Sequence, residues 1–303
     1  MKRVLIFGHA GFSGFYMTRY LQTLPGITIF GVDLKKSNTI DEFQEDLTDF
    51  TGINRIIEQI RPDYIVNLSG LNHADDPAQL YAANIFPVIN TIRSLNRNRF
   101  FETNLLTISS AAVYGDSGID PITEEARVKP VNTYGASKLA MEQLVPVMSG
   151  NNKCKIMIAR TFNLIGPGLS EMLSVPSFIK QLTKIGKRES DPIINVGNLK
   201  PGRDYVDIRD AVKAYWKIIT GGKPGEIYNV GSGKSHKMKG ILDIIIHVMG
   251  ISVSVETDPN RVRKNEIMNS LADITKIKTL GWSPEIELET SIVDMIEYYQ
   301  HGK

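Results

Sequence analysis

Tyr134 and Lys138 are the first residues whose types and spacing point to chemistry. They stand four positions apart in a segment predicted to be helical, so both side chains would lie on one face, one turn apart. A neighbouring ammonium, together with a positive nicotinamide, lowers the pKa of a phenol from its reference value of about 10. Ser109 and Ser110 stand at the end of a predicted strand, where a hydroxyl could hydrogen-bond the same substrate oxygen. Spacing alone does not identify a site, because Tyr299 and Lys303 repeat it at the C-terminus.

A glycine-rich turn near the N-terminus predicts a dinucleotide site. Gly8, Gly11 and Gly14 are spaced at three residues, after a predicted strand and before a predicted helix. Small residues let the backbone approach a pyrophosphate, and the helix N-terminus supplies free N–H groups and a favourable dipole. Asp33 ends the second predicted strand about 20 residues later, where an acidic side chain can bind a ribose 2′-hydroxyl. The pattern indicates NAD(H) or NADP(H) as cofactor.

The residues after Asp33 leave the choice of dinucleotide open. Asp33 favours NAD(H), whereas Lys35 and Lys36 could hold the 2′-phosphate of NADP(H). Tyr134 and Lys138 would contact the nicotinamide end. Further cofactor contacts are expected around the turn and at the ends of the following strands, from Phe12, Ser13, Leu34, Asp46, Leu47, Leu68, Ser69, Gly70, Asn84, Ser109 and Thr161.

Alternating strands and helices must position these residues, and they predict an α/β protein with a Rossmann-type, doubly wound parallel sheet. Six strands are expected, one of them ending at Asp46-Leu47 and the others at Val4–Phe7, Thr28–Val32, Tyr64–Leu68, Leu105–Ser109 and Lys155–Arg160. Helices are expected at Pro77–Asn98 and Thr133–Met148. Another follows the glycine turn, with one face formed by Tyr16, Met17, Tyr20 and Leu24.

A smaller C-terminal substrate-binding lobe is predicted after Gly166, where prolines interrupt the pattern at Pro167, Pro176, Pro192 and Pro201. A helix at Asp210–Thr220 and a strand at Glu226–Val230 would return to the first domain. We expect a dinucleotide-binding domain of residues 1–163 plus about 207–232, and a lobe of about 164–206 plus 233–303. The apolar stretch Ile241–Val255 is interrupted by polar residues and predicts a core helix running into a strand, not a membrane span.

Composition and charge exclude several classes of partner. The chain has 303 residues, of which 42% are hydrophobic and 22% charged, enough to bury a sizeable core. A formal net charge of +2 is too small to predict binding to nucleic acid or to a membrane. The single cysteine, Cys154, fits a reducing compartment, so we expect a cytoplasmic location. No metal site is expected.

Three segments resemble extended short-chain dehydrogenases/reductases (SDRs) that modify nucleotide-linked sugars. They are Gly8–Gly14, the run Ser-Ser-Ala-Ala-Val-Tyr-Gly at 109–115, and Tyr134-Gly-Ala-Ser-Lys138. The resemblance covers nearly the whole chain and implies that Ser110, Tyr134 and Lys138 are catalytic. It also implies a homodimer formed through Pro77–Asn98 and Thr133–Met148.

Segments of the C-terminal half, at 160–168, 178–181, 196–199 and 203–216, resemble more narrowly the GDP-6-deoxy-4-keto-D-mannose reductases that make GDP-D-rhamnose. This resemblance implies contacts with the nucleotide diphosphate from Asn163, Lys180 and Arg203. Arg263 and Glu266 match a further phosphate or ribose contact, although Lys264 replaces the proline of the family pattern. The implied substrate-binding set is completed by Ser110, Ala111, Tyr134, Gly197 and Asn198.

The expected reaction is therefore reduction of a C4 ketone in a nucleotide-linked 4-keto-6-deoxy sugar. Related dehydratases carry acidic residues directly after the catalytic serine, whereas this chain has Ala111 and Ala112, which cannot transfer protons. Cys154 precedes a predicted strand and lies too far from the nicotinamide for epimerase-reductase chemistry of the fucose-synthase type. An NAD-dependent 4-epimerase needs the same Ser-Tyr-Lys set and is an alternative, as are dTDP- or CDP-linked substrates. A non-catalytic dinucleotide sensor would typically lack the Tyr134 and Lys138 pair.

Overall fold

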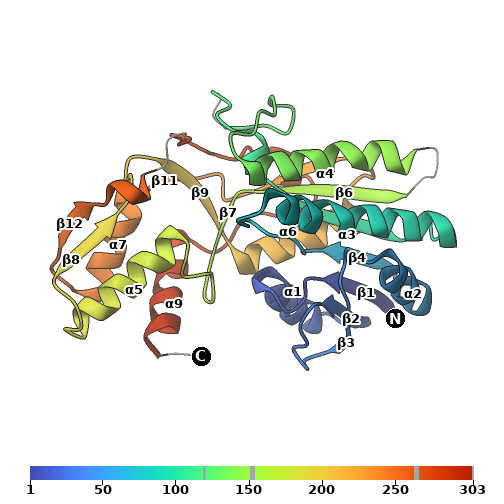
Figure 1. The fold of residues 1–303 in the computed structure, drawn as a ribbon, viewed down its shortest axis with the longest axis horizontal. Helices are drawn as coiled ribbons and strands as arrows, with labels where there is room; N and C mark the ends of the chain where they lie inside the picture. The colour runs from blue at the N-terminus through green and yellow to red at the C-terminus, as the bar shows by residue number, and fades with distance from the viewer. Residues whose placement is uncertain (119–120, 151–153, 263–265, 302–303) are drawn as a thin grey trace.

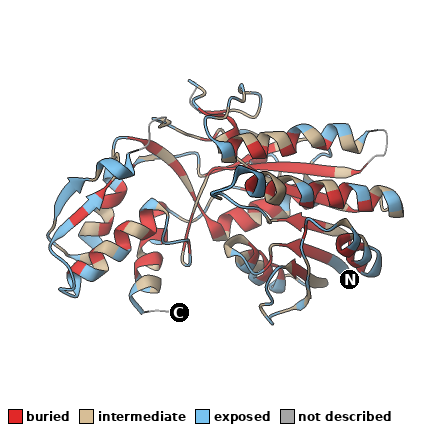
Figure 2. Cartoon of the chain, viewed as in Figure 1, coloured by how far each residue is buried: buried red, intermediate tan, exposed pale blue. Residues whose placement is uncertain are grey.

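The structure is a computed structural model that describes residues 1–118, 121–150, 154–262 and 266–301. Figure 1 shows two unequal parts, with a helix-flanked central sheet on the right and a smaller lobe on the left. Buried residues follow the central strands and the inner faces of the helices in both parts (Figure 2). Among the described residues, no helix combines the length and apolarity needed to cross a membrane.

The central sheet contains seven strands in the order β10-β6-β5-β4-β1-β2-β3, and every neighbouring pair is parallel. The chain reverses direction across the sheet between β1 and β4, which is the point where a doubly wound fold binds its ligand. The α/β, Rossmann-type prediction is therefore confirmed. The strands are β1 (Lys2–Phe7), β2 (Ile27–Asp33), β3 (Asp41–Gln44), β4 (Tyr64–Asn67), β5 (Asn104–Ser110), β6 (Lys155–Thr161) and β10 (Ile227–Val230).

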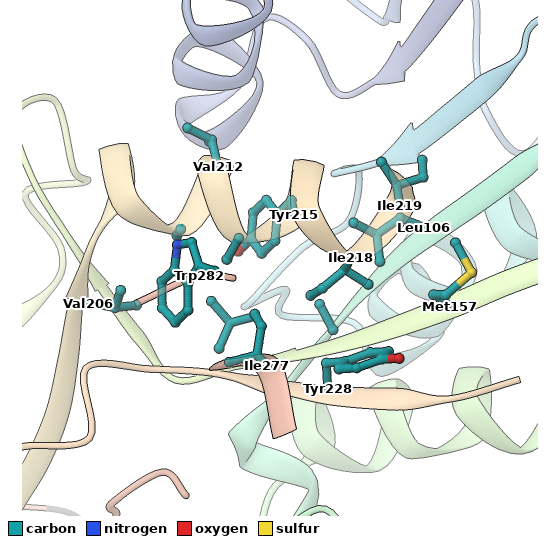
Figure 3. Packing of buried hydrophobic residues seen from close by; sticks show 14 of the residues in the cluster. Leu106, Met157, Val206, Val212, Tyr215, Ile218, Ile219, Tyr228, Ile277 and Trp282 are labelled. Atoms are coloured by element: carbon teal, nitrogen blue, oxygen red, sulfur yellow. The ribbon is translucent and has the colours of Figure 1, made fainter. Parts of the chain in front are cut away.

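Helices cover both faces of this sheet because each presents one apolar side to it. On one face, α1 (Phe12–Gln22) and α6 (Ile208–Gly221) pack against the strands. Figure 3 shows Tyr215 and Ile218 of α6 within this core, with Trp282 beside them from a much later segment. The other face is covered by α2 (Phe50–Ile60), α3 (Pro77–Asn98) and α4 (Thr133–Ser149).

The smaller lobe has a hydrophobic core of its own, formed by three helices and short strands. Its helices are α5 (Ser174–Gly186), α7 (Met238–Met249) and α9 (Leu288–His301). The short strands are β7 (Asn163–Ile165), β8 (Ile193–Val196), β9 (Gly202–Asp207), β11 (Ser235–Lys237) and β12 (Ser254–Thr257). Phe12, between Gly11 and Gly14 of the glycine turn, packs against both this core and the one beneath α1 and α6. The two cores therefore meet at the predicted cofactor turn.

Most predicted elements are present with bounds close to those expected, and three differences stand out. The third strand ends at Gln44 rather than at Asp46-Leu47. The helix after the glycine turn ends at Gln22, so Leu24 lies beyond it, although Leu24 still packs against the core. Strand β5 extends to Ser110, which places the predicted catalytic serine at the last position of the sheet. The predicted division into two domains stays a prediction.

Candidate active site

The glycine turn is built so tightly that side chains would not fit. Gly8 adopts φ +76°, and a Cβ there would lie 3.0 Å from the backbone of Ser69. A Cβ on Gly14 would lie 2.1 Å from the carbonyl oxygen of Gly8. Gly11 is the N-cap of α1, and no side chain caps this helix end. The backbone N–H groups at the start of α1 are thus suited to receive an anion, as a dinucleotide diphosphate requires.

Asp33 ends β2 beside this turn. Its Oδ2 accepts a hydrogen bond from the backbone N–H of Ala10 at 3.2 Å, and its Oδ1 accepts one from Lys35 at 3.4 Å. The carboxylate is thereby held at the position where Rossmann-type proteins recognise the adenosine ribose. Leu34, Lys35 and Lys36 are exposed around it. Asp33, which favours NAD(H), and the two lysines, which could hold the 2′-phosphate of NADP(H), are therefore close together at the end of β2.

Two predicted cofactor residues after β3 have structural partners instead. Asp46 accepts hydrogen bonds from the backbone N–H and the hydroxyl of Thr48, both at 2.8 Å, and so forms a local turn. Leu47 is buried, and its carbonyl accepts a hydrogen bond from the Asn90 side chain on α3. Their part in cofactor binding stays a prediction.

The Ser110 side chain lies close enough to the Tyr134 phenol to act on its pKa, which it lowers. Ser110 stands at the end of β5 and also accepts a hydrogen bond from the backbone N–H of Ala112 at 3.2 Å, which fixes its side chain. Tyr134 is at the start of α4, where Asn132 caps the helix. Burial raises the pKa of Tyr134, and the contact with Ser110 only partly offsets this effect. In the chain alone the phenol is therefore held in its protonated form. The lowering of this pKa by Lys138 together with the nicotinamide stays a prediction.

Lys138 lies one turn further along α4 and is buried. Its Nζ donates a hydrogen bond to the backbone carbonyl of Ile108 in β5 at 3.0 Å. Burial lowers the pKa of Lys138 to about 8, while the negative charge of Glu142, a further turn along the helix, acts in the opposite direction. The ammonium is therefore retained at neutral pH but lies close to its titration point.

Asn84 ties the loop after β4 to the helix that carries Tyr134 and Lys138. Its side chain exchanges two hydrogen bonds with the backbone of Leu71, at 2.9 and 3.0 Å, and donates a third to Ser137 at 2.8 Å. Gly70 adopts φ +135°, and a Cβ there would lie 2.4 Å from Asn84 Oδ1 and 3.2 Å from Lys138 Nζ. The predicted cofactor residues Gly70 and Asn84 thus border the Lys138 ammonium.

Other predicted cofactor residues lie at the same carboxyl edge of the sheet. The Ser109 hydroxyl is buried and has no hydrogen-bond partner within the described ranges. Such a group is costly unless a ligand satisfies it, and a nicotinamide carboxamide offers both a donor and an acceptor. At the end of β6, Thr161 exchanges a hydrogen bond of 2.9 Å with the buried phenol of Tyr215. With the glycine turn and Asp33, the edge fits a nicotinamide dinucleotide.

Three predicted substrate residues come together in the lobe. Glu266 Oε2 accepts a hydrogen bond of 2.8 Å from the Asn198 side chain, and its Oε1 lies 4.0 Å from the Arg203 guanidinium. Glu266 is more than 60 residues away from Asn198 and Arg203 in the sequence, so only the folded lobe brings it to them. A guanidinium fork beside amide and carboxylate groups suits recognition of phosphate and ribose hydroxyls.

The remaining predicted substrate residues are less closely grouped. Asn163 begins β7, and its side chain donates a hydrogen bond of 3.0 Å to the Asp204 carbonyl. Lys180 on α5 forms an ion pair with Glu171. Gly197 allows close passage of the chain, because a Cβ there would lie 2.6 Å from the carbonyl of Arg261. Arg263 lies outside the described residues.

The comparison with known families decides which kind of protein carries this site. The model of the family described as GDP-mannose 4,6 dehydratase matches residues 5–295. The chain belongs to this family of extended SDRs. The members of this extended SDR family that resemble the chain include reductases, dehydratases and epimerases of nucleotide sugars. The chain is accordingly a nucleotide-sugar-modifying enzyme of the SDR type.

Two curated relatives of this extended SDR act on GDP-linked deoxysugars by name. GDP-6-deoxy-D-mannose reductase of Pseudomonas aeruginosa is 29% identical over 238 residues, which are 76% of this chain and 78% of that protein. GDP-6-deoxy-D-talose 4-dehydrogenase of Aggregatibacter actinomycetemcomitans is 25% identical over 281 residues, covering 91% and 90% of the two chains. Among solved structures, RMD from Pseudomonas aeruginosa complexed with NADPH superposes with a TM-score of 0.88 at 24% identity, covering 99% of each chain.

Sequence reasoning missed a buried ion pair directly behind Lys138 in this SDR. Arg160 on β6 contacts Glu142 on α4 through Nε and Nη2, with a shortest distance of 2.7 Å. Arg160 also donates hydrogen bonds to the Tyr114 hydroxyl and to the Glu124 carbonyl. The position of Glu142 on the same face of α4 could be predicted, because Glu142 continues the four-residue spacing of Tyr134 and Lys138. Its partner is 18 residues away on a strand and could not be chosen from spacing.

Proposed function

We propose that this SDR reduces the C4 ketone of a nucleotide-linked 4-keto-6-deoxy sugar with NADPH or NADH. GDP-4-keto-6-deoxy-D-mannose is the proposed substrate, and GDP-D-rhamnose the proposed product. The observation that carries the proposal is the Tyr134 phenol, which lies beside Ser110 at the carboxyl edge of the sheet and is kept protonated by burial. A protonated acid beside a serine hydroxyl is what a ketone needs when it accepts a hydride.

The chain's own residues would handle the proton and the ketone oxygen. The reduced nicotinamide supplies the hydride to C4 of the sugar. Ser110 donates a hydrogen bond to the ketone oxygen and polarises the C=O bond. As the π bond breaks, Tyr134 gives its proton to this oxygen, which yields the C4 hydroxyl and leaves a phenolate. The Lys138 ammonium favours the phenolate until solvent returns the proton.

The relatives support both the cofactor and the sugar. The reductase and the dehydrogenase named above act on GDP-linked deoxysugars by name, and the superposed RMD structure holds NADPH. In this chain, Asn198, Arg203 and Glu266 provide a polar and charged cluster for a nucleotide diphosphate. We infer that the sugar bridges from this cluster to Tyr134.

The residues after Ser110 argue against dehydration, although the family model is named for a dehydratase. Removal of water across C5 and C6 needs an additional acid and base close to the sugar. Ala111 and Ala112 form the short helical turn that follows Ser110, and their methyl groups cannot transfer protons. Reduction needs only the Tyr134 acid, so it is the simpler fit to these residues.

The proposal is tested with purified protein, each reduced dinucleotide and GDP-4-keto-6-deoxymannose. We expect the absorbance of the reduced nicotinamide to fall with formation of one molecule of deoxyhexose per cofactor oxidised. Parallel reactions with dTDP- and CDP-linked ketosugars determine which nucleotide is accepted. No cofactor oxidation with any of these ketosugars would refute the reductase proposal. Tightly bound NAD with interconversion of 4-epimers would identify the protein as an epimerase instead.

A further inference from the structure

A buried contact between His9 and Glu42 connects the glycine turn to the edge of the sheet. His9 Nε2 lies 2.7 Å from Glu42 Oε2, and the two side chains are only 1% and 6% exposed. The imidazole crosses β2 at Gly31, where a Cβ would lie 2.5 Å from the His9 ring. Gly31 therefore leaves the space through which a side chain from the turn after β1 reaches β3. The bridge spans three parallel strands.

Glu42 also holds the loop that joins β2 to β3. Its Oε2 accepts hydrogen bonds from the backbone N–H and the hydroxyl of Ser37, both at 3.0 Å, and its Oε1 accepts one of 2.8 Å from Asn38. These contacts and the one with His9 outweigh the effect of burial and lower the pKa of Glu42 to about 2. Because the carboxylate is ionised, the imidazole Nε2–H is the donor in the His9 contact.

The loop held in this way, residues 34–40, begins directly after Asp33. Asp33 accepts a hydrogen bond from Ala10, and Glu42 contacts His9, so two carboxylates tie the loop to neighbouring residues of the glycine turn. Lys35 and Lys36 are exposed on the loop. In Rossmann-type proteins, an acidic residue at this place binds the ribose 2′-hydroxyl of NADH, and a nearby cation accommodates the 2′-phosphate of NADPH.

We propose that the His9–Glu42 bridge fixes the 34–40 loop and thereby determines how strongly the protein discriminates between NADPH and NADH. The bridge sets where the two loop lysines stand relative to the Asp33 carboxylate. His9 and Glu42 are positioning residues in this account, because neither needs to touch the cofactor. The inference rests on the dinucleotide site of the proposed function and is independent of which sugar is reduced.

The test measures the dissociation constants of NADPH and NADH by nicotinamide fluorescence for the wild type, His9→Leu, Glu42→Gln and the double variant. We expect the wild type to bind one dinucleotide more tightly than the other. In each single variant the ratio of the two dissociation constants should be about fivefold smaller, because one hydrogen bond of ordinary net strength provides a factor of about five. The double variant should lose no more than either single variant, because both substitutions break the same contact. At saturating cofactor, turnover of Glu42→Gln should stay within about twofold of the wild type.

Two further variants separate a loss of position from a loss of folding. Glu45→Gln removes a carboxylate close to the end of β3, where Glu45 Oε2 lies 3.0 Å from the Arg55 guanidinium. Because the Arg55 side chain is 70% exposed, this ion pair contributes little, and the variant should leave the preference unchanged. Ser37→Ala deletes the hydrogen bonds of the Ser37 hydroxyl with Glu42 and Thr39 but keeps the one from its backbone N–H to Glu42. It should fold normally and weaken the preference about twofold.

The outcomes that overturn the inference are distinct from those that overturn the proposed function. Equal affinity of the wild type for both dinucleotides, or an unchanged preference in Ser37→Ala and in both bridge variants, refutes the role of the bridge alone. Losses that add in the double variant refute the coupling of His9 and Glu42. A wild-type protein that binds neither dinucleotide refutes the proposed function together with this inference.

Discussion

At the scale of single residues, the proposed ketone reduction depends on the proton held by Tyr134. Its phenol lies beside Ser110, and burial keeps it protonated. Tyr134→Phe removes the acid and little else, because the ring stays in place. We expect kcat for ketone reduction to fall by at least about a hundredfold, the lower end of what a positioned general acid contributes, with dinucleotide affinity nearly unchanged. Full activity in this variant would show that another group donates the proton.

The pKa of Lys138 predicts how kcat/KM for the ketosugar changes at alkaline pH. Burial lowers the pKa of this lysine to about 8, so its ammonium is complete below that pH and is lost as the pH rises through it. Since the charge favours the phenolate formed at Tyr134, kcat/KM for the ketosugar should decrease above about pH 8. Initial rates across the alkaline range, at saturating cofactor, test this expectation. A profile that stays flat to pH 10 would show that the ammonium has no such role.

What the sequence revealed at this scale was limited to residues that are close along the chain or belong to a recognisable segment. Tyr134 and Lys138 could be paired because one helical turn separates them. The contact of His9 with Glu42 could not be predicted, because it depends on the strand order and on the absence of a side chain at Gly31. The effect of burial on the Tyr134 pKa likewise depends on packing that spacing does not describe.

At the scale of elements, the turn between β1 and α1 makes the sharpest prediction. A Cβ on Gly14 would meet the Gly8 carbonyl oxygen at 2.1 Å, so Gly14→Ala must displace the turn that receives the diphosphate. We expect dinucleotide affinity to fall at least about tenfold, as for the loss of a strong hydrogen bond to a charged group. Titration with NADPH and NADH measures this loss.

Gly240 on α7 provides the matched control for Gly14. Nothing lies within 4 Å of a Cβ at Gly240, and helix propensity favours alanine over glycine by about 1 kcal/mol. Gly240→Ala should therefore leave dinucleotide affinity unchanged and raise the melting temperature slightly. Equal affinities in Gly14→Ala and Gly240→Ala would show that the turn does not bind the dinucleotide.

Elements with strong apolar patterns could be predicted closely, and weakly patterned ones could not. The helix Pro77–Asn98 was predicted with the bounds that the structure shows, since Pro77 can start a helix and the apolar positions recur regularly. Strand β3 has the sequence Asp-Glu-Phe-Gln and lies at the edge of the sheet, so it lacks the hydrophobic signal of a central strand. The sequence therefore predicts its end at Asp46-Leu47, two to three residues beyond Gln44.

At the scale of the whole molecule, we expect a homodimer. Helices α3 and α4 pack side by side, and each exposes a large apolar side chain, Phe86 at 47% and Val147 at 77%. Burial of these side chains against a second copy would remove apolar surface from water. Light scattering on the wild type should give twice the 33.8 kDa of one chain. A variant that carries both Phe86→Lys and Val147→Lys should be monomeric. Met172→Lys, which changes an exposed apolar side chain in the lobe, should remain dimeric. A monomeric wild type would contradict the prediction.

The central claim is that a hydride passes to C4 of the sugar while the chain supplies the proton. The most direct measurement uses dinucleotide carrying deuterium at the transferable position of the reduced nicotinamide, with GDP-4-keto-6-deoxymannose as substrate. We predict one deuterium at C4 of the product sugar and one dinucleotide oxidised per product, as seen by mass spectrometry and NMR. Product without deuterium at C4, or isomerised sugar with no net oxidation of the cofactor, would contradict the claim.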